Sequence, residues 1–225
     1  MPAFILGEKS EQSQTYTKNG VRIPTTLVRT TSCYLIGLKG EPNTHYFALQ
    51  LGFGEAKNIK KPQLGIIKKA GIKTPLRFIK EIRVEKYGNW VKPLTEEDKK
   101  GVQIGEVKVY VGDRLMPTSF FKPGDKVIVS GTSKGKGFQG VVTRHGFSGG
   151  PKTHGQSDRE RAPGSIGQST TPGRVLKGKR MAGRMGRVKT TIKNLEVIEV
   201  KEDALLLKGA LPGAKTALLE IKKIS

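Results

Sequence analysis

Glycines and lysines alternate in two stretches of the chain where a phosphate group could bind. Residues 135–140 read Gly-Lys-Gly-Phe-Gln-Gly and match the GxGxxG pattern of dinucleotide-binding loops. Residues 173–179 read Gly-Arg-Val-Leu-Lys-Gly-Lys and nearly match a triphosphate-binding loop. Glycine lets the backbone approach a phosphate closely, and lysine neutralises its charge. The phosphate could belong to a nucleotide or to a nucleic acid.

Neither stretch lies in the context that a nucleotide site requires. A dinucleotide site opens a helix within a βαβ unit. Here at most a short turn of helix follows, broken by Gly146 and by the Ser-Gly-Gly-Pro of residues 148–151. In the second stretch Arg180 stands where a hydroxyl should hold magnesium, and no strong strand precedes it. We therefore predict contact with nucleic-acid phosphates, with no cofactor and no small-molecule substrate.

Catalytic and metal-binding patterns are also lacking in the sequence. Ser157 and Asp158 lie near His154, but adjacent residues in a flexible loop give no means of orienting a base through a third group. Without clustered cysteines or acids, the histidines do not form a metal-binding set. We therefore expect that the chain is not an enzyme. His145 and His154 are expected to contact nucleic acid, and His45 is expected to lie on the face of a strand.

The lone cysteine and the lone tryptophan are both expected to pack. Cys33 cannot form an intramolecular disulfide, which fits a reducing intracellular setting. It lies in an apolar run, so we expect a buried small side chain rather than a reactive thiol. Trp90 could stack on a base, but packing in the core or in a turn is favoured.

The charge of the chain predicts a polyanionic partner. The 225 residues carry a formal net charge of +22. Such a charge indicates nucleic acid or an anionic membrane. A membrane is not expected, because no apolar run approaches the roughly 20 residues that span a bilayer and no basic amphipathic helix is evident. The N-terminal residues do not resemble a signal peptide, so a cytoplasmic location is expected.

Residues 134–193 concentrate this charge. They hold fourteen Lys and Arg residues, two acidic residues, thirteen glycines and three prolines. Large apolar residues are sparse and show no helical or strand period, so the segment cannot offset its ordering entropy by burial. The alternatives are a solvated linker and a loop that orders on a polyanion, and the high positive charge favours the loop. An out-and-back loop over residues 145–185 would reach on the order of 60 Å at roughly 3.3 Å per residue.

The rest of the chain reads as short strands. The spacing predicts an antiparallel sandwich or small barrel, with the basic segment inserted between strands. A short helix is predicted at residues 62–70, and residues 85–105 are expected to be irregular. Residues 139–144 fit either a strand or a helix. The predicted strands are residues 21–29, 32–38, 45–53, 76–84, 126–130, 194–200, 204–208 and 216–224.

Two long stretches of the basic segment have distinctive sequences. Residues 131–155 run from Gly-Thr-Ser-Lys-Gly-Lys-Gly to Gly-Pro-Lys-Thr-His-Gly, and residues 161–186 run from Arg-Ala-Pro-Gly-Ser-Ile-Gly-Gln to Met-Ala-Gly-Arg-Met-Gly. Both stretches resemble the family of ribosomal large-subunit protein three, in its bacterial form. Residues 19–24 and 205–214 also resemble this family. Residues 10–12 read Ser-Glu-Gln where the family has Val-Gly-Met, and residues 85–121 look longer or divergent.

The resemblance implies a six-stranded barrel similar to those of translation factors, formed by residues 1–130 and 194–225. Residues 131–193 would be an extension that penetrates ribosomal RNA toward the peptidyl transferase centre. The family implies binding near the 3′ end of the large-subunit RNA, early subunit assembly, neighbouring ribosomal proteins as partners, and a cytoplasmic rather than an organellar ribosome. Gln168 matches a glutamine that relatives can methylate. The expected RNA contacts are Lys134, Lys136, Arg144, His145, Lys152, His154, Arg159, Arg161, Gln168, Arg174, Lys177, Lys179, Arg180, Arg184, Arg187 and Lys189.

Overall fold

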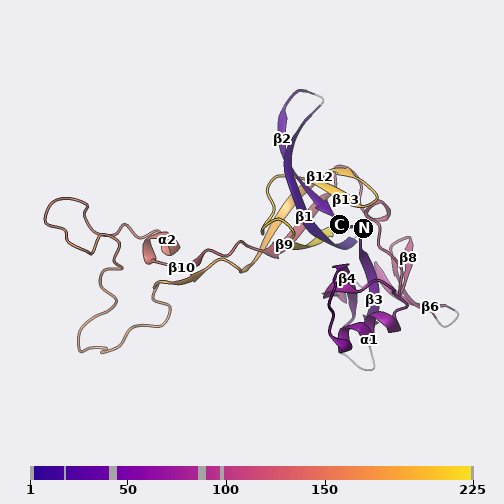
Figure 1. Cartoon of the computed structure of the whole chain (residues 1–225), viewed down its shortest axis with the longest axis horizontal. Coiled ribbons are helices and arrows are strands. Elements are labelled where there is room, and N and C mark those ends of the chain that lie inside the picture. The colour runs from indigo at the N-terminus through magenta and orange to yellow at the C-terminus, as the bar shows by residue number, and fades with distance from the viewer. Residues whose placement is uncertain (1–2, 18, 41–44, 86–89, 97–98, 224–225) are drawn as a thin grey trace. The chain divides into compact units, whose positions relative to one another are not determined.

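Six strands close into an antiparallel β-barrel in a computed structural model of the chain, which describes residues 3–17, 19–40, 45–85, 90–96 and 99–223 (Figure 1). Each strand pairs with two neighbours, so the barrel has no free sheet edge. The predicted mainly β fold with a six-stranded barrel is confirmed. In order around the barrel, the strands are β1 (Ala3–Tyr16), β14 (Leu218–Lys223), β9 (Lys126–Thr132), β12 (Lys189–Val200), β13 (Ala204–Lys208) and β2 (Arg22–Arg29).

Alternate residues of the barrel strands fill its interior. Successive side chains of a strand point to opposite faces, so apolar residues two positions apart point to the same side. Burying each such side chain contributes roughly 1.5–3 kcal/mol relative to leaving it exposed. The apolar pairs that follow this spacing and are at most 1% exposed are Ala3 and Ile5 of β1, Val127 and Val129 of β9, Leu205 and Leu207 of β13, and Leu219 and Ile221 of β14.

Two three-stranded antiparallel sheets share the buried core with the barrel strands. The 3-10 helix η2 (Pro117–Ser119) precedes β9. The first sheet contains β3 (Cys33–Lys39), β4 (Ala48–Glu55) and β5 (Leu76–Arg83), and the second contains β6 (Val91–Glu96), β7 (Lys99–Ile104) and β8 (Val107–Tyr110).

The helix α1 (Lys61–Lys69) joins β4 to β5 and agrees with the helix predicted at residues 62–70. Pro62 occupies its first turn, where a missing N–H costs nothing, and Lys68 and Lys69 lie in its last turn beside the negative end of the helix dipole. Ile67 is its buried residue and packs in a small apolar cluster with Leu76.

Three local expectations were wrong or incomplete. The expected irregular region, residues 85–105, instead forms β6 and β7, although residues 86–89 and 97–98 lie outside the described part of the chain. The histidine expected on a strand face, His45, is exposed in a bend before β4. Trp90 lies in a turn before β6, which agrees with one of the two positions expected for it, but at 49% exposure it is not a core residue.

The chain divides into two compact units. The first comprises residues 1–132 and 189–225, and the second comprises residues 133–188. Thr132 ends β9 and pairs with Lys189, which begins β12, so adjacent strands of the barrel carry both ends of the second unit.

A buried lysine holds the loop between β13 and β14. The ammonium group of Lys9 donates hydrogen bonds to the carbonyl oxygens of Leu211 at 2.7 Å and Gly213 at 3.2 Å, and the residue is only 6% exposed. The Lys9 backbone also bonds the amide of Thr216 and the carbonyl of Ala217. This loop is therefore fixed against β1 by both the backbone and the side chain of one residue.

We expect Lys9→Met to lower the free energy of unfolding by about 2–3 kcal/mol, because it leaves buried carbonyl groups without charged donors. Urea unfolding of the full chain measures the loss. Lys126→Met, an exposed change in β9, is the matched control and should have an effect within about 0.5 kcal/mol. Equal stability of the two variants would contradict the role assigned to Lys9.

Cys33 is fully buried in the core shared by the barrel and the first sheet, as expected for a small packing residue. Burial raises the pKa of its thiol to about 12. Since the thiolate is the reactive form, a thiol-specific disulfide reagent at pH 8 should label Cys33 only as fast as the protein unfolds. Absorbance of the released leaving group, with and without urea, tests this. Rapid labelling of the folded chain would refute it.

Candidate nucleic-acid interface

The second unit begins and ends in a narrow antiparallel ribbon. Strand β10 (Gly137–Gln139) pairs with β11 (Gly183–Met185), and the Ser133 amide donates to the Val188 carbonyl at 2.9 Å. At Gly186, φ is +75° and an added Cβ would lie 2.1 Å from the Lys134 carbonyl oxygen. Only glycine fits there, so the close approach of the two chain segments depends on this residue.

A short helix links this ribbon to the returning chain. Helix α2 (Val141–His145) ends at Gly146 in the left-handed conformation. The Arg144 guanidinium donates to the Met181 carbonyl oxygen at 2.8 Å, and the imidazole Nε2 of His145 lies 3.0 Å from the same oxygen. These two contacts, called here the Met181 clamp, join the two ends of the loop formed by residues 146–180.

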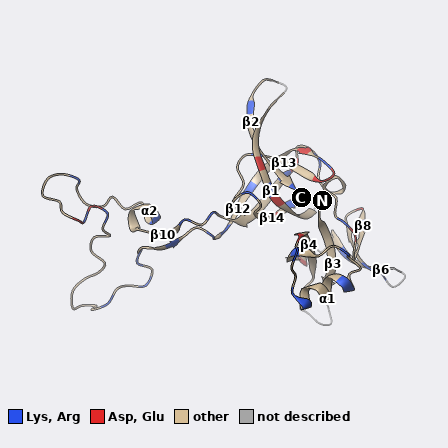
Figure 2. Cartoon of the chain, viewed as in Figure 1, with Lys and Arg blue, Asp and Glu red and all other residues tan. Residues whose placement is uncertain are grey.

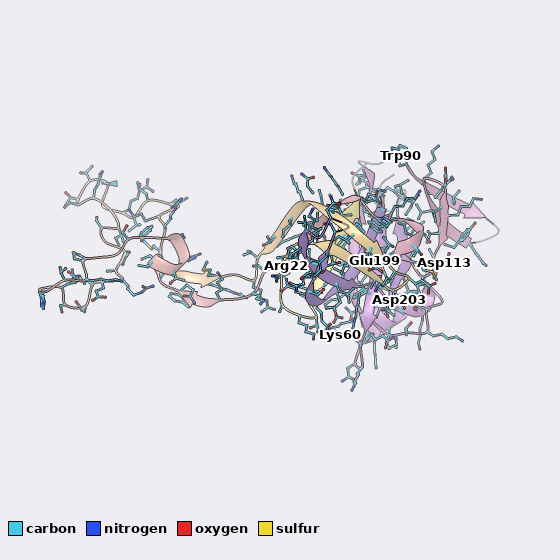
Figure 3. All side chains as sticks on the ribbon, turned by 90° about the horizontal axis from the view of Figure 1, so that it is seen from above. Arg22, Lys60, Trp90, Asp113, Glu199 and Asp203 are labelled. Carbon is cyan, nitrogen blue, oxygen red and sulfur yellow. The ribbon has the colours of Figure 1, made fainter. Side chains whose placement is uncertain are left out.

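Beyond the clamp the segment has no core of its own. All residues from 163 to 182 are exposed, including Leu176 at 60%. Its local order comes from turns, such as the hydrogen bond from the Gly173 amide to the Ser169 carbonyl at 3.2 Å. The side chains of this segment project from the backbone and are not covered by other parts of it (Figure 3). The segment therefore presents nearly all of its side chains to a partner.

Lysine and arginine residues are distributed along the length of the segment (Figure 2). No acidic residue occurs between Arg161 and Leu195, and within the described ranges Lys189 is the one predicted contact residue with a carboxylate partner, Glu220 at 3.0 Å. The other predicted contact cations of the described residues form no ion pair with a carboxylate, which leaves their charge available to a polyanion.

The structure gives the predicted contact residues different surroundings. Arg144 and His145 are half-buried in the Met181 clamp, Arg161 donates to the hydroxyl of Thr143 at 3.2 Å, and Lys189 lies in the barrel. The exposed members of the second unit without a carboxylate partner are Lys134, Lys136, Lys152, His154, Arg159, Arg161, Gln168, Arg174, Lys177, Lys179, Arg180, Arg184 and Arg187. Their contacts with RNA stay a prediction.

One exposed aromatic residue was overlooked in the sequence. Phe138 lies in β10 and is 77% exposed, and Lys134 and Lys136 precede that strand in the chain. Aromatic faces stack on nucleobases. An aromatic residue enclosed by glycines and lysines was the signal that could have identified it.

The secondary structure around the two nucleotide-like motifs differs from that of a nucleotide-binding site. Strand β10 lies within residues 135–140 and pairs antiparallel, and α2 has only five residues, so no βαβ unit begins there. Residues 173–179 lie outside the regular elements. Among the residues described, no group of three His, Cys, Asp or Glu side chains could hold a metal ion. The described helices include none of the length and apolarity needed to cross a membrane.

Comparisons with known proteins agree with the resemblance seen in the residues. A family model described as Ribosomal protein L3 matches residues 106–203. The chain is 48% identical over 223 residues to the large ribosomal subunit protein uL3 of Chloroflexus aggregans, covering 97% of this chain and 96% of that protein. It is 41% identical over 228 residues to the protein of the same name from Leptospira biflexa, covering 100% of both.

The Met181 clamp and the exposed lysines should respond differently to salt. We expect Arg144→Ala to weaken binding to large-subunit ribosomal RNA without changing the slope of log K against log salt, because it removes a contact within the protein. Lys177→Ala, which removes an exposed cation, should reduce the steepness of that slope by about one. Filter binding between 50 and 200 mM salt measures both. Equal reductions would assign Arg144 to a phosphate instead.

Proposed function

Because the chain belongs to the ribosomal protein L3 family, we propose that residues 134–193 bind large-subunit ribosomal RNA near its 3′ end. The chain is a structural constituent of the large ribosomal subunit and not an enzyme. Its partners are ribosomal RNA and other proteins of that subunit, and its similarity to bacterial proteins supports a location in a cytoplasmic ribosome.

The observation that carries the proposal is the exposure of an acid-free cationic segment. Residues 161–195 contain no acid, and residues 163–182 are exposed throughout. Each phosphate that a lysine or arginine neutralises releases counterions, and this release drives association. Arginine can also bind a phosphate through two parallel hydrogen bonds or stack on a base. The irregular single strands and 2′-hydroxyls of ribosomal RNA suit such a segment.

The same segment gives the protein a role in assembly. A loop that orders along several RNA helices stabilises their arrangement, so its binding early in assembly would favour the folded form of the RNA. We assign peptide-bond formation to the RNA, with the loop supporting the region of the peptidyl transferase centre from outside the reaction. Gln168 is exposed, so a modifying enzyme could reach it for methylation.

We further propose that the two units have separate tasks. The barrel buries its own apolar core, as with Val129 and Leu207, whereas Val141 is the buried apolar residue of the second unit among those described. Residues 1–130 and 194–225 would therefore fold without RNA, and residues 131–193 would supply the penetrating contacts.

The test compares the full chain with a variant in which a short glycine linker replaces residues 140–182. This variant keeps strands β10 and β11, so we expect its barrel to unfold cooperatively on heating. Circular dichroism measures this unfolding. We expect the variant to bind large-subunit ribosomal RNA roughly 10²-fold or more weakly at 150 mM salt, because many phosphate contacts are lost. Competition with duplex DNA is measured in the same assay.

Three results would overturn these assignments. Equal affinity of the full chain for duplex DNA and ribosomal RNA would indicate a general nucleic-acid binder. Unchanged RNA affinity in the variant would move the interface to the barrel. Loss of cooperative unfolding in the variant would show that the barrel does not fold without the segment.

A further inference from the structure

A hollow of about 570 Å³ lies within the loop of residues 146–164. Its volume falls within the roughly 300–1,000 Å³ range of small-ligand pockets. It is formed by this one loop, so it belongs wholly to the second unit. Neither the Met181 clamp nor the run of exposed cations accounts for it.

Backbone contacts across the loop hold the hollow open. The Gly150 amide donates to the Glu160 carbonyl at 2.8 Å. At Gly149, where φ is +78°, an added Cβ would lie 2.1 Å from the carbonyl oxygen of Glu160. At Gly150 it would lie 3.0 Å from the carbonyl oxygen of Arg159. Gly149 is therefore needed for the two sides of the loop to meet, and at Gly150 a larger residue would make a tight contact. Arg161 anchors the loop to α2 through Thr143.

The walls combine flat apolar surfaces with a few hydrogen-bonding groups. Phe147 and Ala162 are half-buried there, and Pro163 adds a second ring. The Phe147 ring packs against the His145 ring, with centroids 6.0 Å apart. Gln156 contributes a half-buried carboxamide that can both donate and accept. Such walls suit a planar ligand with polar edges.

The charge around the hollow differs from that of the rest of the segment. Asp158 and Glu160 are the two acids of residues 134–193, and both are neighbours of the lining residue Arg159 in the chain. A phosphate bound here would meet nearby carboxylates, which repel it. An uncharged planar group avoids this repulsion and can bond the edge groups of Gln156 and Arg159.

We propose that this hollow receives a single unpaired nucleobase of ribosomal RNA. The base stacks against Phe147 or Pro163, and Gln156 and Arg159 bond its edge. The inference rests on the proposed RNA-binding function and adds a specific base contact to it. Whereas the exposed cations bind phosphates irrespective of sequence, the hollow fixes the register of the loop on one nucleotide.

The experiment places a photoreactive residue in the hollow of the full chain. p-Benzoylphenylalanine replaces Phe147 in a tagged copy expressed in a bacterium, and large ribosomal subunits are purified and irradiated. Val175, which is exposed in the same segment and outside the hollow, is replaced in a matched control. We expect Phe147 to crosslink to one unpaired nucleotide, and Val175 to crosslink elsewhere. Crosslinks from Phe147 only to protein, or spread over paired nucleotides, would overturn the proposal.

A second measurement uses smaller substitutions and does not depend on the photoreactive group. Base-specific chemical probing of subunits that carry Gln156→Ala should show at least about a threefold rise in reactivity at the crosslinked nucleotide. Thr170→Ala, a change at an exposed residue of the same segment that does not line the hollow, should leave that reactivity unchanged. No rise with Gln156→Ala would overturn the base contact, although the protein would still be a subunit component. Absence of the tagged wild-type chain from large subunits would overturn the proposed function as well.

Discussion

The antiparallel pairing of β9 with β12 is the constraint on which the basic segment depends. Thr132 lies opposite Lys189, and Ser130 and Thr191 add a hydrogen bond between their hydroxyls at 2.8 Å. Val129 beside them is fully buried, so the barrel core fixes the register of this pair. Because the cost of closing a loop grows only slowly with its length, one well-packed strand pair can hold a very long insertion.

Carboxylates are divided unequally between the two units, and this division separates folding from binding. In the barrel, Lys223 pairs with Asp125 at 2.6 Å and Lys208 pairs with Glu196 at 3.0 Å. In residues 161–195 there is no acid to make such pairs. The repulsion between its cations expands the free segment, and a polyanion removes that repulsion. The same residues that oppose compaction in the free protein therefore favour the bound form.

Most barrel strands and α1 could be predicted because each carries a complete local signal. Strand β2 follows the turn residues Asn19 and Gly20, and β9 contains the continuous apolar run from Val127 to Val129 after a turn. Strand β1 was missed because its second half, from Glu11 to Tyr16, is polar and mostly exposed and pairs with β2 alone. Strands β6 and β7 were missed because Pro93 and the lysines at 99 and 100 interrupt their apolar pattern.

The candidate site was predictable in charge but not in geometry. Composition located the cationic segment, since the clustering of charge is a property of the sequence alone. The Met181 clamp was not visible, because His145 and Met181 are 36 positions apart and the shared group is a backbone carbonyl. The hollow was not visible either, since it arises where the Gly149 backbone meets that of Glu160. Contacts made by backbone atoms of residues far apart in the chain leave no pattern of side-chain types in the sequence.

Some glycines of the basic segment allow close contacts within the chain, although glycine-rich sequences are usually flexible. The composition of this segment predicts flexibility, yet Gly149, Gly183 and Gly186 lie where an added Cβ would meet another atom at 2.1–2.7 Å. At these positions glycine allows close packing of the chain on itself. Local order of this kind lowers the conformational entropy lost on binding, so more of the electrostatic attraction to RNA appears as affinity. The segment thus combines turns that its glycines allow with cations that stay exposed because few large apolar residues are present to form a core around them.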